Sequence, residues 1–355
     1  MIKVLIVDDS ASIRELFTEM FEREDDFEVV GCADDGASAL DMVKEFSPDV
    51  VTMDVNLPDY DGFTVTRLIM EECPVPIVII SAVYSSSDAE LGFRLLDTGA
   101  LAFHDKPAIN SSDFSDRMAE IVMSVRLMSE VRVVRRKSRF SRMANPPFAK
   151  FSSSISTSTD STGKVVCIGA STGGPQAVKQ VLMSLPIDFC APVLVIQHIS
   201  GGFTEGMVNW LKDNTGHNIK IAEHGEKLTS GVVYFGPEGK HLEINGEREI
   251  RLTNSPPVNG IRPTVSALFE SAAHNLGSSV VGVLLTGMGR DGADELLDIR
   301  RCGGHTIAQD QETSIVFGMP GEAVKIGAAI KILPIDRIGE EIVSYVCGNQ
   351  GKNFV

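Results

Sequence analysis

Short apolar runs alternate with amphipathic stretches along the first third of the chain. The runs are of strand length and lie near residues 2–7, 28–32, 49–53, 76–80 and 100–104. Helical patterns separate them, and a further helical pattern follows at about 112–137. Five strand–helix repeats in so short a segment predict a compact, doubly wound α/β domain with a parallel sheet. We place this domain at residues 1–123.

The alternation stops after this last helix. The chain becomes basic between residues 132 and 142, and a Ser/Thr-rich run follows at 152–159. Low hydrophobicity and Ser/Thr richness are typical of flexible linkers, so we assign residues 124–163 as the end of the helix plus a linker. The basic run either is a solvated tether, which is the more common case, or holds an acidic surface.

A second alternating segment covers residues 164–355. Apolar runs predict parallel-type strands at 165–168, 192–196, 280–285 and 305–308. Helical patterns lie at about 175–184, 203–214, 263–275, 292–302 and 335–346. A β-rich insert is expected over 219–253, where Asn245-Gly246 between apolar runs is a strong hairpin signal. The whole chain is thus predicted to be a two-domain α/β protein whose second domain has a mainly parallel sheet and a β-hairpin insert.

The composition narrows the function classes. The 355 residues are 43% hydrophobic and 23% charged, as in globular proteins, and the formal net charge of −16 argues against nucleic-acid binding. The six cysteines form no C-x-x-C pair and show no metal-finger spacing, and several of them lie in apolar strands or helices. We therefore expect small core residues in a reducing compartment. No leader or membrane-length apolar run is recognisable, and we expect a cytoplasmic protein that is not membrane-inserted.

Polar residues follow the predicted strands of the first domain. Asp8 and Asp9 come after the first strand, Asp54 after the third, Ser81 after the fourth and Lys106 after the fifth. Ligands of doubly wound sheets bind at this edge. Converging carboxylates favour Mg²⁺, and a lysine with a hydroxyl suits a phosphoryl group. Taken singly, the acids are equally well explained as helix caps.

These residues carry a family resemblance. The chain resembles the receiver domain of two-component response regulators over residues 1 to about 123. The motifs that match are Val7-Asp8-Asp9-Ser10, Met53-Asp54, Leu57-Pro58-Asp59-Tyr60-Asp61-Gly62, Ser81-Ala82 and Asp105-Lys106-Pro107. The resemblance implies a flavodoxin-like receiver in which Asp54 accepts a phosphoryl group from a histidine kinase.

The same resemblance implies a ligand set. Asp9, Asp54 and the main-chain carbonyl of Asn56 would bind Mg²⁺, with Asp8 acting through water. Ser81 and Lys106 would contact the phosphoryl oxygens. No cofactor is expected for the chemistry of the second domain.

Candidate chemistry in the second domain comes from three residues that follow apolar strands. Ser171 lies in Gly169-Ala170-Ser171-Thr172-Gly173, which matches the G-x-S-x-G pattern of serine nucleophiles. His198 and Asp291 follow two other strands, and a serine needs such a base and acid to attack. Each has an ordinary alternative: a connecting or phosphate-binding turn, a structural histidine and a helix cap. The order Ser…His…Asp also differs from that of α/β-hydrolases.

The second domain closely resembles the chemotaxis protein-glutamate methylesterases over nearly all of 164–347. The matching motifs are Ile168-Gly169-Ala170-Ser171-Thr172-Gly173-Gly174-Pro175, Gln197-His198, Tyr234-Phe235-Gly236-Pro237, Arg262-Pro263, Leu285-Thr286-Gly287-Met288-Gly289-Arg290-Asp291-Gly292-Ala293, Ile307-Ala308-Gln309-Asp310 and Val316-Phe317-Gly318-Met319-Pro320. The resemblance implies hydrolysis of γ-glutamyl methyl esters on the cytoplasmic helices of chemoreceptors, with release of methanol, and deamidation of glutamines.

In that reading Ser171 attacks the ester, His198 is the general base and Asp291 orients it. The main-chain N–H of Met288 stabilises the oxyanion, and Thr172 lies beside the nucleophile. The family arrangement further implies that phosphorylation of the receiver relieves a block on the esterase. Two alternatives stay open: a receiver-controlled esterase of a non-chemotaxis pathway, and a non-catalytic response regulator that binds a partner. A nucleotide-binding output domain is disfavoured because no Gly-Lys-Ser/Thr follows the turn.

Overall fold

The chain divides into two compact units, Met1–Lys150 and Phe151–Val355. The computed structural model describes residues 1–82, 93, 96–107, 114–131, 133, 163–199, 201–258 and 260–348. The basic and Ser/Thr-rich stretches of the predicted linker lie outside the described residues. Within the described ranges, no helix combines the length and the apolar character needed to cross a membrane.

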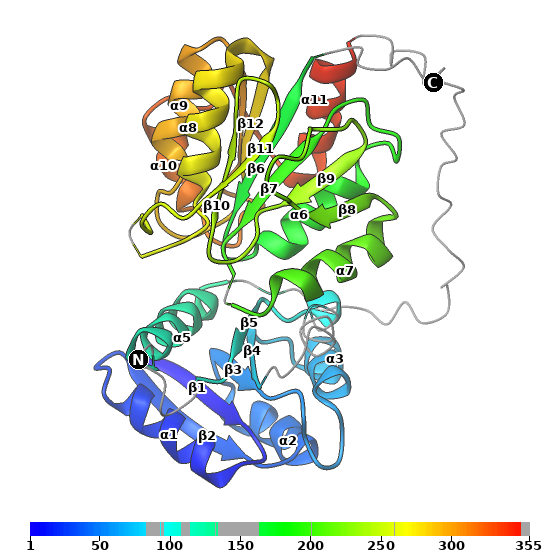
Figure 1. The fold of residues 1–355 in the computed structure, drawn as a ribbon. Coiled ribbons are helices and arrows are strands. Elements are labelled where there is room, and N and C mark those ends of the chain that lie inside the picture. Colours follow the sequence, from blue (N-terminus) through cyan, green and yellow to red (C-terminus); the bar gives the residue numbers. More distant parts are fainter. Residues whose placement is uncertain are drawn as a thin grey trace. The chain divides into compact units, whose positions relative to one another are not determined.

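The first unit is the doubly wound α/β domain that the sequence predicts. Its sheet has the strand order β2-β1-β3-β4-β5, and every strand pair is parallel. The strands are β1 (Ile2–Val7), β2 (Phe27–Ala33), β3 (Val50–Met53), β4 (Ile77–Ser81) and β5 (Ala102–Asp105). The helices described are α1 (Ala11–Glu22), α2 (Gly36–Phe46), α3 (Gly62–Glu72) and α5 (Phe114–Ser129). Helices α1 and α5 cover one face, and α2 and α3 cover the other (Figure 1).

Burial explains why the central strands β3 and β4 of this unit are largely apolar. With helices on both faces of the sheet, the residues of β3 and β4 are buried along the whole strand. Short polar side chains start the helices: Asp35 accepts a hydrogen bond from the Ser38 N–H, and Asp61 from the Thr64 N–H. Asp59 binds the N–H groups of Gly36 and Ala37 at 2.7 and 2.9 Å, so it ties the loop after β3 to the start of α2.

The second unit is built on a seven-stranded, entirely parallel sheet. Its strand order is β14-β13-β12-β6-β7-β9-β8. The strands are β6 (Val165–Ala170), β7 (Val193–Gln197), β8 (Asn218–Ile221), β9 (Val232–Phe235), β12 (Val280–Leu284), β13 (His305–Gln309) and β14 (Lys331–Leu333). The four central strands β6, β7, β12 and β13 are buried throughout. Their apolar composition follows from cover on both faces.

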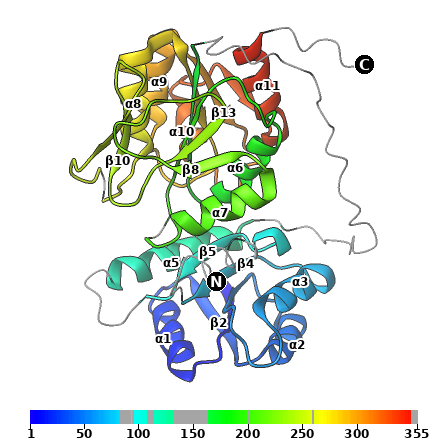
Figure 2. The ribbon, with the colours of Figure 1, turned by 45° about the vertical axis from the view of Figure 1, so that its right-hand side comes forward.

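Helices flank this sheet on both sides, as Figure 2 shows. One set comprises α6 (Gly174–Met183), α7 (Thr204–Thr215) and α11 (Ile335–Cys347). The other comprises α8 (Val265–Leu276), α9 (Ala293–Arg301) and α10 (Met319–Lys325), with a 3₁₀ turn at Gly277–Ser279. Helix α10 and the edge strand β14 are not predicted from the sequence, because seven and three residues are too short to show a clear periodicity.

The predicted β-rich insert at 219–253 is only partly correct. Strands β8 and β9 belong to the main sheet, because the apolar run Val232–Phe235 pairs in parallel with β7. Only β10 (His241–Ile244) and β11 (Ile250–Thr253) form a separate antiparallel hairpin. The hairpin signal at Asn245-Gly246 is confirmed. The left-handed residue of this turn is Arg248 (φ 61°), and the Asn245 Oδ1 accepts from the N–H groups of Glu247 and Glu249.

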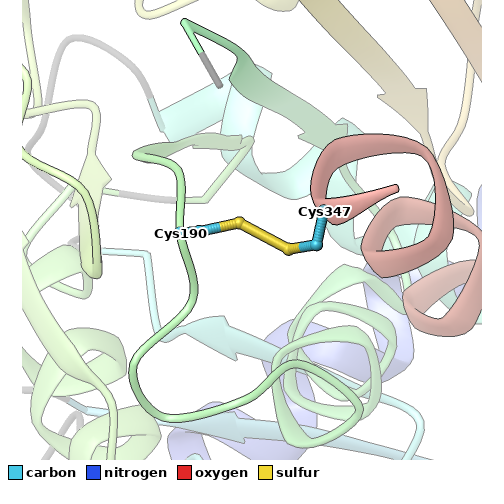
Figure 3. The surroundings of a disulfide bond; sticks show 2 residues. All are labelled: Cys190 and Cys347. Carbon is cyan, nitrogen blue, oxygen red and sulfur yellow. A yellow bond between two sulfur atoms is a disulfide. The ribbon is translucent and has the colours of Figure 1, made fainter. Parts of the chain in front are cut away.

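The expectation that the cysteines are small core residues is wrong for most of them. Cys167 lies buried in β6, as expected. Cys190 and Cys347, however, form a disulfide that links the segment before β7 to the end of α11 (Figure 3). Cys32 and Cys302 are exposed. The paired cysteines are 157 positions apart, and such a pairing cannot be deduced from spacing alone.

Candidate active site and acidic cluster

The three candidate residues of the second unit follow three adjacent strands. Ser171 follows β6, His198 follows β7, and Asp291 lies on the loop after β12. Strand β6 lies between the other two strands, and its pairing places Ala170 beside Gln197 and Gly169 beside Leu284. After β6, the strands β7, β8 and β9 are added on one side of β6 in the strand order. The later strands β12, β13 and β14 are added on its other side. Ligands of open α/β sheets bind at such a switch point, at the carboxyl ends of the strands.

Ser171 sits on a turn that main-chain contacts hold in place. Its N–H donates to the Thr286 carbonyl (3.0 Å), and its carbonyl accepts from the Gly174 N–H (2.7 Å) and from the Gln197 side chain (2.8 Å). Gly173 takes the left-handed conformation at the start of α6, with φ 77°. Among the described residues, the non-glycine residues with positive φ are Ser47 and Arg248, so the turn bends at Gly173 and not at the serine.

His198 and Asp291 form a direct pair. The His198 Nε2 lies 2.8 Å from the Asp291 Oδ2, and both side chains are largely buried. An ionised carboxylate only accepts hydrogen bonds, so Nε2 carries the hydrogen in this pair. The ring nitrogen that remains for proton exchange is therefore Nδ1.

Asp291 is held by the start of α8 as well as by the histidine. Its Oδ2 accepts from the Val265 N–H at 2.7 Å, and its Oδ1 accepts from the Ser266 N–H at 3.0 Å and from the Ser266 hydroxyl at 2.5 Å. Burial by itself would raise the pKa of this carboxyl. The hydrogen bonds from His198, Ser266 and Val265 outweigh burial and lower the pKa, so Asp291 stays ionised.

The loop that carries Met288 is anchored on both sides. The Thr286 hydroxyl donates to the Thr172 carbonyl at 2.9 Å and accepts from the Val316 N–H at 2.9 Å. The Gly287 carbonyl accepts from the N–H groups of Gly318 and Met319. Gly287 lies so close to the nucleophile that an added Cβ would be 2.7 Å from the Ser171 Cβ. The Met288 side chain itself is exposed.

The first unit gathers an acidic cluster at the carboxyl ends of its strands. One carboxylate oxygen each from Asp8, Asp9 and Asp54 lies within 4.8 Å of the others. The Lys106 Nζ lies 2.7 Å from the Asp8 Oδ2 and 2.8 Å from the Asp54 Oδ2. Ser81 ends the neighbouring strand β4, where it pairs with Asp105 of β5. Asp105 directly precedes Lys106, so Ser81 lies at the same edge of the sheet as the cluster. Asn56, two residues after Asp54, is exposed.

The electrostatics of the cluster reflect buried negative charge. Burial raises the pKa of Asp8, and the charge of Asp54 adds to this, while Lys106 and the Ser10 N–H offset it in part. Burial would lower the pKa of Lys106, but its bonds to Asp54 and Asp8 raise it. Several carboxylate oxygens that face one another are the ligands that Mg²⁺ prefers, so this donor set fits such an ion.

Some residues that hold the candidate site of the second unit are not predicted from the sequence. Ser266 and Val265 hold Asp291, and Glu295 contacts Ser266 at 2.8 Å. Thr286 and Gln309 brace the loop after β12, with the Thr286 N–H donating to the Gln309 side chain. One signal was available: Glu295 lies in the first turn of α9, only four residues after Asp291, so the two acids are close together in the chain.

The fold and these two sites define a class of protein. The chain joins a receiver-type α/β domain, with an acidic cluster and a lysine, to a second α/β domain that presents a serine, a histidine and an aspartate. The family models agree: residues 4–117 match the response regulator receiver domain and residues 166–342 match CheB methylesterase.

Similar proteins extend this match over nearly the whole chain. A protein-glutamate methylesterase/protein-glutamine glutaminase of Syntrophus aciditrophicus is 46% identical, over 97% of this chain and 98% of its own. One of Methanospirillum hungatei is 42% identical, over 94% and 95%. The crystal structure of the Thermotoga maritima CheB methylesterase catalytic domain has a TM-score of 0.51 and 36% identity, and the match covers 52% of this chain and all of that one.

The chain therefore belongs to the family of protein-glutamate methylesterases/protein-glutamine glutaminases, enzymes that combine a receiver domain with a methylesterase domain. Both resemblances drawn from the sequence motifs are confirmed, as is the two-domain α/β fold.

Proposed function

We propose that this protein hydrolyses γ-glutamyl methyl esters on the cytoplasmic helices of chemoreceptors, and deamidates glutamines there, under control of receiver phosphorylation. The observation that carries the proposal is the His198–Asp291 pair of 2.8 Å on the strand ends that flank Ser171. We further propose the boundaries 1–123 for the receiver domain, 124–163 for the linker and 164–355 for the esterase domain, and a cytoplasmic location.

In the proposed mechanism Ser171 is the nucleophile. Its Oγ attacks the ester carbonyl carbon while its proton passes to the Nδ1 of His198. Asp291 stabilises the imidazolium through Nε2 and fixes the tautomer. The protonated histidine then gives its proton to the departing methoxide, so that methanol leaves. Water repeats the sequence on the acyl-enzyme and releases the glutamate carboxylate; with glutamine, ammonia leaves in place of methanol.

The oxyanion of each tetrahedral intermediate requires hydrogen-bond donors. We assign the main-chain N–H of Met288 to this role, because the turn at 286–290 is fixed by its contacts to Val316, Gly318 and Met319. Thr172 lies next to the nucleophile and is tied to the same turn through Thr286. Removing one such donor typically costs about 3 kcal/mol of transition-state stabilisation.

In the receiver domain we propose Asp54 as the phosphoryl acceptor. Asp8, Asp9, Asp54 and the main-chain carbonyl of Asn56 would hold Mg²⁺, which neutralises charge on a transferred phosphoryl group. Lys106 already bridges Asp8 and Asp54, and Ser81 lies on the adjacent strand, so both are suited to contact the phosphoryl oxygens. The phosphoryl donor would be the histidine kinase of the same pathway.

The decisive experiment measures methanol release from methylated receptor membranes. Wild type is compared with Ser171→Ala and Asp54→Asn, each with and without a small phosphodonor and Mg²⁺. We expect release from wild type, stimulation by the phosphodonor, loss of release in Ser171→Ala and loss of stimulation in Asp54→Asn. No release from wild type would refute the receptor substrate and leave an esterase of another pathway. Release that persists in Ser171→Ala would refute the mechanism.

A further inference from the structure

The hydroxyl of Ser266 lies between two acids. Ser266 is in the first turn of α8, which packs beside α9 in both ribbon views (Figure 1, Figure 2). Its Oγ is 2.5 Å from the Asp291 Oδ1 and 2.8 Å from the Glu295 Oε2. The N–H of Gly292 also donates to this oxygen, at 3.1 Å. One hydroxyl group thus has three hydrogen-bonding neighbours.

A count of hydrogens limits the charge state of this group. A serine hydroxyl has one hydrogen and two lone pairs, and an ionised carboxylate only accepts. The contact of 2.5 Å between Ser266 and Asp291 is in the range of a charge-assisted O–H···O⁻ bond, so the serine hydrogen lies there. Gly292 occupies one lone pair. The contact with Glu295 is then a hydrogen bond only if Glu295 supplies the hydrogen.

The alternative, in which Asp291 carries the proton, conflicts with its donors. Asp291 receives hydrogen bonds from His198, from the N–H groups of Val265 and Ser266, and from the Ser266 hydroxyl. The donors from His198 and from the two N–H groups are present wherever the Ser266 hydrogen lies, and donors to a carboxylate favour its ionised form. Glu295 has no comparable set of donors among its hydrogen bonds, which run to Ser266 and to its own main chain.

We infer that Glu295 is protonated and donates to the Ser266 hydroxyl, which donates to Asp291, so that Ser266 and Glu295 are positioning residues for the active-site carboxylate. Every hydrogen and lone pair at Ser266 is then used. The Asp291 Oδ1 is fixed by Ser266, which keeps the Oδ2 directed at His198. The inference deepens the proposed esterase function and rests on it for the role of Asp291.

The charges around Glu295 favour its neutral form. Burial raises the pKa of Glu295, and the charges of Asp291 and Asp294 raise it further. The other ionisable residues on α9 and on the elements packed against it are Asp298, Arg300 and Arg301 on α9, Glu270 and His274 on α8, Glu322 and Lys325 on α10, and His305 on β13. Of these, Lys325 pairs with Glu322 (3.3 Å), Arg301 with Asp298 and His305 with Glu341.

Activity tests the inference through matched substitutions in the full-length enzyme. We expect Glu295→Ala to lower kcat/KM for receptor ester about tenfold and Glu295→Gln, which keeps a neutral donor, to recover most of it. Ser266→Ala should lower kcat/KM by a similar factor, and Ser266→Thr, which keeps the hydroxyl, should recover most of it. The control is Glu340→Gln, an exposed glutamate on α11 that pairs with Arg337, which should leave kcat/KM unchanged.

Two further measurements separate positioning from a merely structural role. In wild type, kcat/KM should fall on the basic side as Glu295 loses its proton, and Glu295→Gln should lack that fall. In infrared difference spectra of wild type against Glu295→Gln near neutral pH, the carbonyl stretch of a protonated carboxylic acid should appear in wild type only.

The inference is overturned if that infrared band is missing, if Glu295→Gln is as damaging as Glu295→Ala, or if Ser266→Ala has full activity. The infrared band does not depend on the substrate. If wild type released no methanol while the band was present, the proposed function would fail and the protonated Glu295 would stand.

Discussion

The two units place acids at the same point of two parallel sheets and treat them in opposite ways. In the second unit, Asp291 receives four hydrogen bonds, from His198, Val265 and the N–H and hydroxyl of Ser266. In the first unit, the buried acids Asp8 and Asp54 share the amine of Lys106 and have one main-chain donor each, from the N–H groups of Ser10 and Val55. The exposed Asp9 brings a third carboxylate to the same cluster. At one site a single carboxylate has all of its acceptor positions filled by hydrogen-bond donors. At the other site three carboxylates lie close together with few donors.

The difference shows how the same edge of a sheet serves two purposes. A carboxylate whose acceptors are filled is held in one position and charge state, which suits an acid that must orient a histidine. Carboxylates with spare acceptors and a raised pKa, as at Asp8, favour a cation that neutralises them. The first arrangement is preorganised, whereas the second is suited to exchanging its ligands.

The largest effect expected from this comparison is that of Asp291→Asn. An amide nitrogen brings its own hydrogens toward the donors that now surround the carboxylate, and it no longer stabilises the imidazolium of His198. We expect kcat for ester hydrolysis to fall by about 10⁴. The control is Asp294→Asn, an exposed acid paired with Arg290, for which less than a twofold change is expected. If kcat falls less than tenfold in Asp291→Asn, the filled acceptor positions of Asp291 are not required for catalysis.

A smaller effect is expected when the shared cation is removed from the first unit. Lys106→Met leaves Asp8 and Asp54 buried without their partner, and we expect its free energy of unfolding to fall by about 3 kcal/mol. Added Mg²⁺ should recover part of this loss, since another cation then faces the acids. Denaturant titrations of the full chain, with and without Mg²⁺, measure the loss of unfolding free energy and its recovery. Lys44→Met, which breaks an exposed pair with Glu72, is the control and should cost less than about 1 kcal/mol. Equal losses in the two variants would contradict the comparison.

The smallest effect is an opposite pH dependence at the two sites. The pKa of Asp8 is raised on folding, so its ionisation costs stability as pH rises above the ordinary value of 3.8. The pKa of Asp291 is lowered, so its contribution to stability is present above 3.8 and is lost as pH falls through the folded pKa.

Asp8→Asn should therefore stabilise the first unit at neutral pH, and this gain should vanish in acid. Asp291→Asn should destabilise the second unit at neutral pH, and this loss should shrink in acid. Unfolding free energies of each variant and of wild type, followed from about pH 3 to about pH 7, test the signs. A destabilising Asp8→Asn at neutral pH would contradict the raised pKa.

Much of the fold was predictable because parallel sheets covered on both faces leave a simple trace in the sequence. The strands after which Asp54, Ser171 and His198 appear are continuous apolar runs, and their observed ends lie within two residues of the predicted ones. A polar residue directly after such a run must lie at the carboxyl edge of the sheet. For this reason the sequence alone predicts which polar residues gather at these two sheet edges.

Other features depend on contacts between distant segments. Strands β8 and β9 look like part of an insert until their pairing with β7 places them in the main sheet. The Cys190–Cys347 disulfide joins positions 157 residues apart. Ser266 resembles any residue in the first turn of a helix, and only the packing of α8 against α9 brings it between Asp291 and Glu295.

The sequence by itself determined the two α/β units, the strand ends that carry each acid, and the family, because burial on both sheet faces and local turn chemistry are properties of short segments. The tertiary structure alone decided the charge states of the acids. Hydrogen-bond donors for Asp291 come from α8, some 25 residues away along the chain, and the partner of Asp54 comes from Lys106, 52 residues away. Such neighbours decide whether a buried carboxylate is surrounded by hydrogen-bond donors or by other acids, and only the packing of the folded chain brings them together.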